Sequence, residues 1–376
     1  MSRSHNPIQA NDLEALWRDA GEDAVGAMRR VGESGWYILG DEVKGFESAL
    51  ASYWGLPHAV GCANGMDAIE ISLRALGLEP GDKVLTTPLS AFATTLAIVR
   101  AGGVPVFVDT DERGLLDLGA CRAALAADPS IGFLVPVHLF GFALDLTNLE
   151  SLRDEFGLKV VVDCAQAIGA TSGGRQVGGI GQMAITSFYP TKNLGAIGDA
   201  GALLTGDESL ATAARALRDY GQSAKYVHDR IGLNSRLDEL HAAILKDAML
   251  PRLDGWTARR REIATRYLAE ITHPRIQPLG APEGIESVWH LFPIVVETGR
   301  EALLDHLKEG GICTGVHYPV LIPYQAALAT APHEIIGGLP NAERLAAGEI
   351  SLPLHPFLSD DEIGRVISCA NTWNGP

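Results

Sequence analysis

Two periods of hydrophobic and polar residues alternate along the first part of the chain. Short apolar runs, typical of buried strands, are separated by longer segments in which apolar residues recur every three to four positions, as in amphipathic helices. The predicted helices are 41–53, 63–76, 92–101, 118–127, 146–156 and 210–218. The predicted strands are 84–87, 104–108, 133–137, 159–163, 184–189 and 202–205. Because strands and helices alternate, and the strand runs are apolar throughout, we expect an α/β fold with helices on both faces of a mostly parallel sheet.

The pattern changes after residue 205. A long helical segment, 237–267, contains Pro251, which should start a new helix or kink the run. Its three consecutive arginines, 259–261, are predicted to form a solvated helix face. Further expected elements are strands at 288–296 and 312–316 and helices at 301–308 and 360–370. We therefore predict two units: an N-terminal segment with a large domain over 1–250, and a smaller α+β domain over 251–376.

Composition and charge narrow the class of protein. The 376 residues are 47% hydrophobic and 20% charged, as in a globular protein with a substantial core. Apolar runs long enough to span a membrane are absent, and residues 1–11 lack the apolar centre of a signal peptide. Five scattered cysteines without paired metal-ligand spacing indicate reduced thiols in a cytoplasm and no metal site. Acidic residues exceed basic ones by 46 − 30 = 16, which argues against nucleic-acid binding but permits a local basic pocket for a small anion.

One lysine is placed where its chemistry could change. Lys192 is flanked by Phe188 and Leu194 and is followed by three glycines spaced three apart. A free lysine has a pKa of roughly 10.4 and becomes a useful nucleophile when burial suppresses its charge or when it forms a Schiff base. Read alone, Lys192 is an ordinary surface lysine before a turn. The nearby glycine-rich stretch 173–181 is predicted to be a hairpin, because no helical pattern follows it.

Four features at predicted strand ends change that interpretation. Gly65 and Met66 begin a helix after an apolar run, where free amides could hold a phosphate. Asp163 ends the strongest strand pattern, and Gln166 follows it. Phe92 begins a helix after another strand and could stack on a flat ring. The fourth feature is the pair Ser187 and Lys192.

Each of these features has an ordinary structural reading: a capped turn, a helix N-cap, a core aromatic residue. Together, in this order, they are the parts of a pyridoxal phosphate site, which needs a phosphate cradle, a ring cover, an acid for the ring nitrogen and a lysine.

The motifs that contain these residues resemble the DegT/DnrJ/EryC1/StrS family of sugar-nucleotide aminotransferases, pyridoxal phosphate enzymes of fold type I related to aspartate aminotransferase. The resemblance extends over nearly the whole chain. Its motifs are Gly35–Gly40, Leu78–Val84, Val135–Gly141, Asp163–Gln166, Ser187–Ala202, Gly232–Leu240 and His317–Pro319. It implies a large domain with a mostly parallel mixed sheet between helices, and a smaller C-terminal domain.

The resemblance also implies residue roles. Lys192 would form the Schiff base and move the proton, and Asp163 would pair with the ring nitrogen. The other implied cofactor contacts are Gln166 to the ring hydroxyl, Phe92 stacked on the ring, Gly65, the amide of Met66 and Ser187 to the phosphate, and Asn234 to the phosphate of the neighbouring subunit in a homodimer. Tyr189, Lys225, His317 and Tyr318 match positions near the sugar nucleotide.

The implied activity is transfer of an amino group, usually from L-glutamate, to a nucleotide-linked keto-sugar in amino-sugar, glycan or natural-product biosynthesis. Residues 193–202 look more like members that aminate C-3 of a hexose than those that aminate C-4. Two departures are Met66, where relatives commonly have Thr or Ser, and the segment after Pro319, which lacks the second histidine of many relatives. A keto-cyclitol aminotransferase and a non-catalytic, regulatory pyridoxal-phosphate-binding protein remain alternatives.

Overall fold

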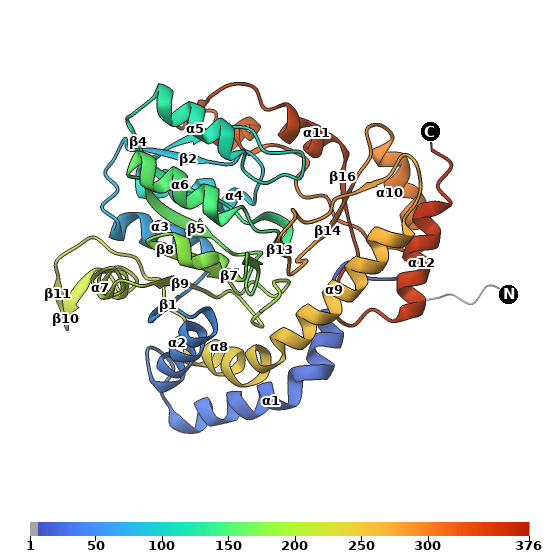
Figure 1. Cartoon of the computed structure of the whole chain (residues 1–376). Helices are drawn as coiled ribbons and strands as arrows, with labels where there is room; N and C mark the ends of the chain where they lie inside the picture. The colour runs from blue at the N-terminus through green and yellow to red at the C-terminus, as the bar shows by residue number, and fades with distance from the viewer. Residues whose placement is uncertain (1–6, 376) are drawn as a thin grey trace.

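The computed structural model describes residues 7–375, so the prediction made for residues 1–11 lies partly outside the described residues. Its centre is an eight-stranded sheet (Figure 1) with the order β1-β9-β8-β5-β4-β2-β3-β15. The strands are β1 (His58–Cys62), β2 (Lys83–Thr86), β3 (Val104–Phe107), β4 (Ile131–Val135), β5 (Lys159–Asp163), β8 (Met183–Ser187), β9 (Gly201–Thr205) and β15 (Glu334–Ile335). The pairs from β8 to β15 are parallel, and β9 is antiparallel to both its neighbours.

Helices cover both faces of this sheet. One face packs against α3 (Gly65–Ala75), α4 (Phe92–Ala101) and α7 (Glu208–Leu217). The other face packs against α5 (Leu118–Ala127) and α6 (Leu146–Phe156). Successive strand residues serve opposite faces: Val161 packs with the α3 side, and Val160 and Val162 pack with the α6 side. The predicted α/β class and mostly parallel mixed sheet are confirmed.

The long helical segment is interrupted as predicted. Helix α8 (Glu239–Ile244) passes through a π-helical turn (Leu245–Met249) and a 3-10 turn (Leu250–Arg252), which contains Pro251, into α9 (Leu253–Glu270). The predicted solvated arginine face is wrong for Arg260, which is buried. Its guanidinium donates to the carbonyls of Trp289, His290 and Leu354 at 3.2, 3.4 and 2.6 Å.

The C-terminal part has its own three-stranded antiparallel sheet, in the order β12 (Gln277–Pro278), β14 (Phe292–Val295) and β16 (Glu349–Leu352). It packs with α9, α10 (Arg300–Glu309) and α12 (Asp360–Asn371). The predicted strand 312–316 is wrong: single bridges join Ile312 to Ile8 and Gly315 to Ser351. Since β15 pairs with β3, this part also completes the large sheet. A domain boundary near residue 250 stays a prediction.

The remaining elements are short, apart from two helices that pack at one end of the molecule (Figure 1). These are α1 (Leu13–Ser34), which the sequence analysis did not predict, and α2 (Asp41–Trp54). The hairpin predicted for 173–181 is found at 171–176, as β6 (Thr171–Ser172) and β7 (Arg175–Gln176), whereas residues 177–180 form a 3-10 turn. The others are β10 (Gln222–Ala224), β11 (Val227–His228), β13 (Ile285–Glu286), α11 (Pro340–Gly348) and the 3-10 turns Leu139–Gly141, Val177–Ile180, Ile322–Tyr324 and Ala326–Leu328.

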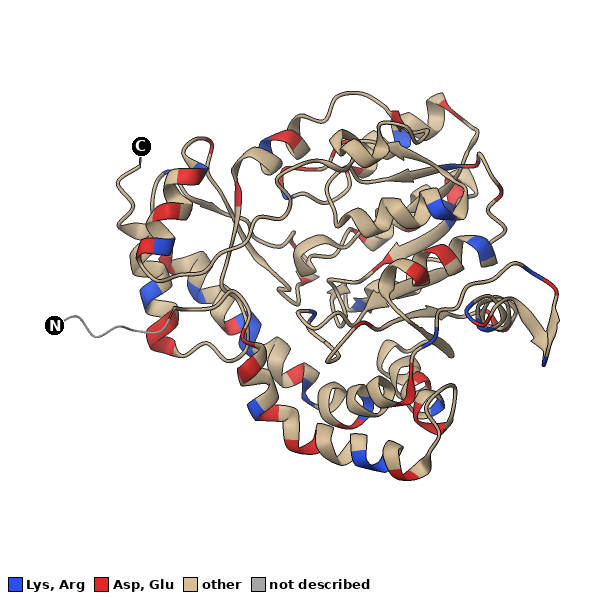
Figure 2. Cartoon of the chain, turned by 180° about the vertical axis from the view of Figure 1, so that it is seen from behind, with Lys and Arg blue, Asp and Glu red and all other residues tan. Residues whose placement is uncertain are grey.

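Charged residues lie mainly on the outer helices, where acidic and basic side chains are interspersed (Figure 2). Many form exposed ion pairs, such as Arg18 with Glu14 and Arg266 with Glu270. Across residues 7–375, none of the helices combines the length and the apolar character that crossing a membrane requires.

Candidate active site

Lys192 lies in the turn after β8, on a rigid support. The turn is closed by backbone bonds from Lys192 N to Tyr189 O at 2.8 Å and from Ala196 N to Phe188 O at 2.7 Å. The flanking Phe188 and Leu194 are fully buried, while Lys192 itself is half-buried. Burial lowers the pKa of Lys192 to about 8, and the negative charge of Asp163 opposes that shift. Burial therefore moves the pKa of Lys192 in the direction that its sequence context predicts.

Asp163 is the last residue of β5, and its side chain is buried. One carboxylate oxygen accepts the Thr94 hydroxyl at 2.9 Å, and the other accepts the Ala165 backbone N–H at 3.0 Å. Burial raises the pKa of Asp163, whereas both hydrogen bonds and the Lys192 charge oppose the rise. Sequence reasoning missed Thr94, although it lies two residues after Phe92 at the start of α4.

Gln166 links this strand end to the C-terminal part. Its side-chain oxygen accepts the Phe140 backbone N–H at 2.7 Å, and its amide nitrogen donates to the Tyr318 hydroxyl at 3.3 Å. Burial raises the pKa of Tyr318 to about 12. Two predicted site residues, 152 positions apart in sequence, are thus in direct contact.

A cradle of backbone and small side chains lies at the start of α3. Asp67 N donates to the cap Asn64 Oδ1 at 2.8 Å, which leaves the first amides, those of Gly65 and Met66, without an acceptor inside the helix. A Cβ on Gly65 would lie 2.8 Å from the Ser187 Cβ, so these two predicted residues are adjacent. The first turn of α3 and the end of β8 therefore lie directly against each other.

Two other predicted residues lie at the starts of the same helices. Phe92, the first residue of α4, is half-buried and packs against the cluster of Phe107, Ile322 and Leu328. The Met66 side chain is directed towards α4, where its Sδ lies 3.9 Å from Arg100 Nη1. The backbone of Met66 therefore lies at the helix start while its side chain packs along the neighbouring helix.

Two histidines from the C-terminal part lie near Lys192. Burial lowers the pKa of His317 to about 4, and the Lys192 charge lowers it further. The same two causes, burial first, lower the pKa of His290. His290 Nδ1 lies 3.1 Å from Asn193 Oδ1, and Asn193 Nδ2 donates to Val288 O at 2.9 Å. The sequence analysis gave no signal for His290 or Asn193.

Tyr189 is 52% exposed, and it contacts this centre through its backbone carbonyl, which accepts the Lys192 N–H. Two other predicted residues are not brought to this centre by contacts within one chain. Lys225 and Asn234 belong to an arm, residues 219–236, that contains β10 and β11 and projects beyond α7 (Figure 1). Lys225 Nζ lies 5.3 Å from the centre of the Tyr226 ring, and Asn234 Oδ1 accepts from Arg236 at 2.5 Å. Over residues 7–375, no hydrogen bond joins Lys225 or Asn234 to Lys192, Asp163 or Gln166.

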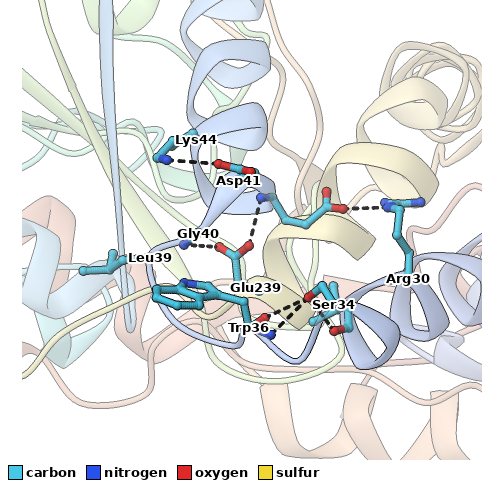
Figure 3. Close-up of a pocket in the computed structure, with 10 residues that line it drawn as sticks. Arg30, Ser34, Trp36, Leu39, Gly40, Asp41, Lys44 and Glu239 are labelled. Atoms are coloured by element: carbon cyan, nitrogen blue, oxygen red, sulfur yellow. Dashed lines mark hydrogen bonds and ion pairs between the residues drawn. The ribbon is translucent and has the colours of Figure 1, made fainter.

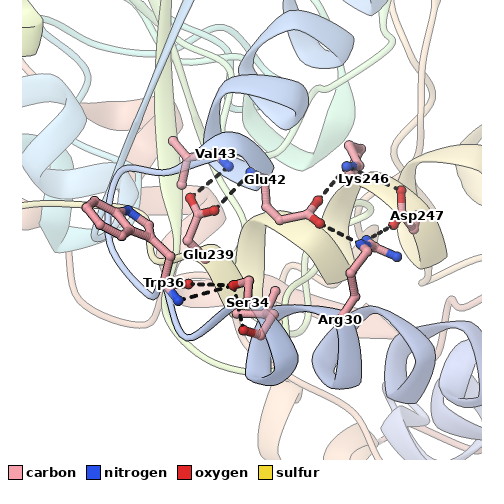
Figure 4. Close-up of polar contacts among 9 residues, drawn as sticks. Arg30, Ser34, Trp36, Glu42, Val43, Glu239, Lys246 and Asp247 are labelled. Carbon is pink, nitrogen blue, oxygen red and sulfur yellow. Dashed lines mark hydrogen bonds and ion pairs between the residues drawn. The ribbon is translucent and has the colours of Figure 1, made fainter.

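A tightly held loop, residues 35–40, precedes α2. The buried carboxylate of Glu239 accepts the backbone N–H groups of Gly40 (Figure 3) and of Glu42 and Val43 (Figure 4) at 2.8, 2.9 and 3.0 Å, which satisfies the start of α2. The Glu42 side chain forms ion pairs with Arg30 and Lys246 (Figure 4). A cavity of about 430 Å³ lies beside the loop. The loop itself exposes Trp36, Tyr37 and Ile38.

Comparison with known proteins agrees with this geometry. Residues 18–371 match the DegT/DnrJ/EryC1/StrS aminotransferase family. The chain is 42% identical over 377 residues to the dTDP-3-amino-3,4,6-trideoxy-alpha-D-glucose transaminase of Streptomyces venezuelae, covering 99% of this chain and 98% of the relative.

Two solved structures have the same fold. The S. venezuelae DesV crystal structure in complex with a ketimine intermediate has a TM-score of 0.94 at 40% identity, covering 98% of this chain and 99% of that one. NtdA from Bacillus subtilis with bound cofactor PMP has a TM-score of 0.88 at 30% identity, covering 98% and 85%. The predicted fold type, enzyme class and cofactor, pyridoxal phosphate, are confirmed, and the chain belongs to the DegT/DnrJ/EryC1/StrS aminotransferase family.

Proposed function

We propose that this aminotransferase transfers an amino group from L-glutamate to the C-3 ketone of a nucleotide-linked deoxyhexose, in amino-sugar or glycosylated natural-product biosynthesis. The observation that carries the proposal is the half-buried Lys192, with a pKa of about 8, electrostatically coupled to the buried Asp163. The names of the relatives support the substrate class: besides the S. venezuelae enzyme, a 36% identical relative is a UDP-N-acetyl-3-dehydro-alpha-D-glucosamine 3-aminotransferase.

The residues at the strand ends fit pyridoxal phosphate. The free amides of Gly65 and Met66, with the adjacent Ser187, suit a phosphate, because a side chain at Gly65 would fill the space beside Ser187. Asp163 is buried and has a carboxylate oxygen beside Thr94, which suits a protonated ring nitrogen. Gln166 would take the ring hydroxyl, and Phe92 would cover one face of the ring. When bound, the cofactor supplies an electron sink for the carbon that loses its proton.

The chain's own residues then hold and move protons. Lys192, once released from the cofactor, has an amine that is neutral in a substantial fraction near pH 8, so it can take a proton from the donor's α-carbon and return it elsewhere. Asp163 would keep the ring nitrogen of the bound cofactor protonated, because leaving that buried carboxylate without a cation is unfavourable. His317, Tyr318, Tyr189 and Lys225 are proposed to contact the sugar nucleotide.

We infer further that the site is completed by a second copy of the chain. In the arm, Tyr226 and Ile231 are 83% and 88% exposed. Large exposed apolar patches commonly mark sites of protein–protein interaction. The loop 35–40 adds exposed Trp36 and Tyr37. Pairing two copies through these surfaces would bury the apolar residues and would carry Asn234 to the phosphate in the other subunit.

Two broader predictions stay proposals as well. All five cysteines are free thiols, which suits the reducing cytoplasm. A boundary near residue 250 is supported by the order of the strands: those of the large sheet precede it except for β15, and β12, β14 and β16 follow it.

The identity of the amino acceptor can be tested by following the second half-reaction alone. The enzyme is converted to its amino form with glutamate, and dTDP-linked or UDP-linked 3-keto-sugars, 4-keto-sugars and keto-cyclitols are added separately. We expect the visible absorption of the lysine-bound cofactor to return with a 3-keto-sugar nucleotide. Return only with a keto-cyclitol would overturn the substrate class, and return only with a 4-keto-sugar would overturn the position.

The lysine and the shared site are tested together. Lys192→Ala should remain folded but lose the visible band and all turnover, while Lys44→Ala, an exposed lysine paired with Asp41, should keep both. If Asn234→Ala is impaired, mixing it with Lys192→Ala should restore activity, because some hybrid sites then contain both native residues. Proven subunit exchange without any recovery would contradict a shared site.

A further inference from the structure

A buried carboxyl group lies behind His317. Glu349, the first residue of β16, is 0% exposed, and its two carboxyl oxygens have different partners. Oε2 accepts the backbone N–H of His317 at 2.5 Å, and Oε1 is 2.5 Å from the Ser351 hydroxyl. The Ser351 Oγ is in turn 2.8 Å from His317 Nδ1. These contacts form a continuous chain from Glu349 through Ser351 to the imidazole.

Backbone hydrogen bonds hold these three residues in position. Gly315 and Ser351 exchange two backbone hydrogen bonds, of 3.1 and 2.9 Å, so the segment before His317 lies along β16. The imidazole packs over Gly315, where an added Cβ would lie 2.8 Å from the ring Cε1. Its other face is edge-on to Tyr318, whose hydroxyl contacts Gln166. Among the described residues, His317 Nε2 has no hydrogen-bond partner, and the ring is close enough to Lys192 to sense its charge.

The hydrogen bonds that join Glu349, Ser351 and the His317 ring can point in either of two self-consistent directions. If Glu349 is ionised, it accepts from the Ser351 hydroxyl, so Ser351 Oγ must accept from His317 Nδ1–H, and Nε2 carries a lone pair. If Glu349 is protonated, Oε2 is already used as an acceptor by His317 N–H. The acid proton on Oε1 then points to Ser351, the Ser351 hydroxyl points to Nδ1, and Nε2 carries the proton.

We propose that Glu349 and Ser351 are positioning residues that set which ring nitrogen of His317 carries the proton, so that Nε2 can switch between donor and acceptor towards a bound substrate. The switch leaves the imidazole neutral in both states. It moves one proton: a proton arriving at Nε2 displaces the Nδ1 proton to Ser351 Oγ, and the Ser351 proton passes to Glu349 Oε1. No electrons are transferred, and the reverse shift returns the proton to the site.

Burial and the charged groups around Glu349 place its titration, and so the switch, in an experimentally accessible pH range. Burial raises the pKa of Glu349 to about 8, against the opposing effects of Ser351, the His317 N–H and the Arg300 charge. The neighbouring Tyr318 feels the Glu349 charge and has its own pKa raised to about 12, so it stays neutral over this range. Lys192 and the burial of the ring keep the pKa of His317 near 4, so the imidazole does not gain a second proton.

The test is nitrogen NMR of the holoenzyme labelled with ¹⁵N-histidine, with the His317 signals assigned by their loss in His317→Gln. In the wild type we expect the Nε2–H tautomer well below pH 8 and the Nδ1–H tautomer well above it, with the ratio changing by up to about tenfold per pH unit near the midpoint. A tautomer that does not change across this range would overturn the proposal, and this result needs no variant to fold.

Variants separate the switch from general packing. Glu349→Gln should keep the Nε2–H tautomer at every pH, because its amide oxygen accepts from His317 N and its amide nitrogen donates to Ser351. Ser351→Ala should abolish the pH dependence, and Ser351→Thr should retain it. The matched control is Ser72→Ala, which removes another fully buried hydroxyl, bonded to Ala68 O at 2.7 Å in α3. Persistence of the switch in Ser351→Ala would contradict the proposal.

A kinetic consequence rests on the proposed function. If the acceptor sugar contacts Nε2, the acceptor half-reaction of the wild type should have a limb near pH 8 that Glu349→Gln lacks, while the glutamate half-reaction changes less than about threefold. A tautomer switch without this kinetic limb would contradict the acceptor contact at Nε2 and leave the Glu349–Ser351–His317 chain intact.

Discussion

The strand ends and the arm handle their functional residues in opposite ways. At the strand ends, Asp163 and Gln166 are buried and have their hydrogen bonds within the chain. In the arm, Asn234 is exposed, and Tyr226 and Ile231 are almost fully exposed. A single chain therefore completes the chemistry of the lysine but leaves the arm without a packing partner. The difference fits the proposal that the strand ends hold the cofactor within one chain and that a second copy covers the arm.

The arm provides the largest expected effect. Ile231→Asp should weaken dimerisation more than about a hundredfold, because each copy loses roughly 1.5–3 kcal/mol of apolar burial and a symmetric interface loses it twice. Sedimentation at several protein concentrations measures the change in the dimer dissociation constant. Leu268→Asp on α9, also a partly exposed apolar residue, is the control and should leave the dimer unchanged. Equal weakening by both variants would show that the arm is not the interface.

At the strand ends, Gly65→Ala should weaken cofactor binding by roughly 5- to 150-fold. The new Cβ would lie 2.8 Å from Ser187 Cβ, and such overpacking typically costs about 1–3 kcal/mol. Gly132→Ala, in β4, meets no atom within 4 Å and serves as the matched control. Equilibrium dialysis with pyridoxal phosphate gives the two affinities. An unchanged affinity in Gly65→Ala would separate the α3 cradle from the phosphate.

This contrast also explains what the sequence could predict. Residues at strand ends follow strong apolar runs, so their order along the chain indicates a common edge of the sheet. Helices 92–101, 118–127 and 146–156 have the predicted bounds because each has clear apolar spacing and flanking turn residues. The sequence pattern did not predict α1, because its buried face consists mainly of alanines, such as Ala20, Ala24 and Ala27, which give a weak periodic signal.

Contacts between distant segments carry no such local signal. Thr94 reaches Asp163 across 69 residues, His290 reaches Asn193 across 97, and His317 reaches Ser351 across 34. Arg260 was misread because a triple arginine is usually solvated, yet three carbonyls at the join between α9 and the small sheet satisfy its donors. The expected strand 312–316 fails since it pairs at single residues with two different partners.

A smaller effect tests the electrostatic coupling within the strand-end site. Asp163→Asn removes the negative charge that raises the pKa of Lys192, so the midpoint for the neutral amine should fall below about 8. We expect a shift of no more than about one unit, which is ~1.4 kcal/mol. The pH dependence of Lys192 acylation in the cofactor-free protein, followed by peptide mass spectrometry, measures it. A midpoint that rises in Asp163→Asn would contradict the coupling, whereas Asp199→Asn is the control and should leave it unchanged.

The smallest expected effect concerns Met66, a strand-end position where the family resemblance predicts Thr or Ser. Threonine at this position would place a hydroxyl at the start of α3, where the phosphate is proposed to bind. A hydrogen bond to a charged group contributes about 1.5–3 kcal/mol. Most of that gain should be offset, because the Met66 side chain packs between the helices and contacts Arg100. We therefore expect Met66→Thr to tighten pyridoxal phosphate binding by about threefold, ~0.7 kcal/mol, without changing acceptor preference. Met66→Val, which has the shape of threonine but no hydroxyl, isolates the hydrogen bond. If both variants bind the cofactor equally, the side chain at this position does not face the phosphate.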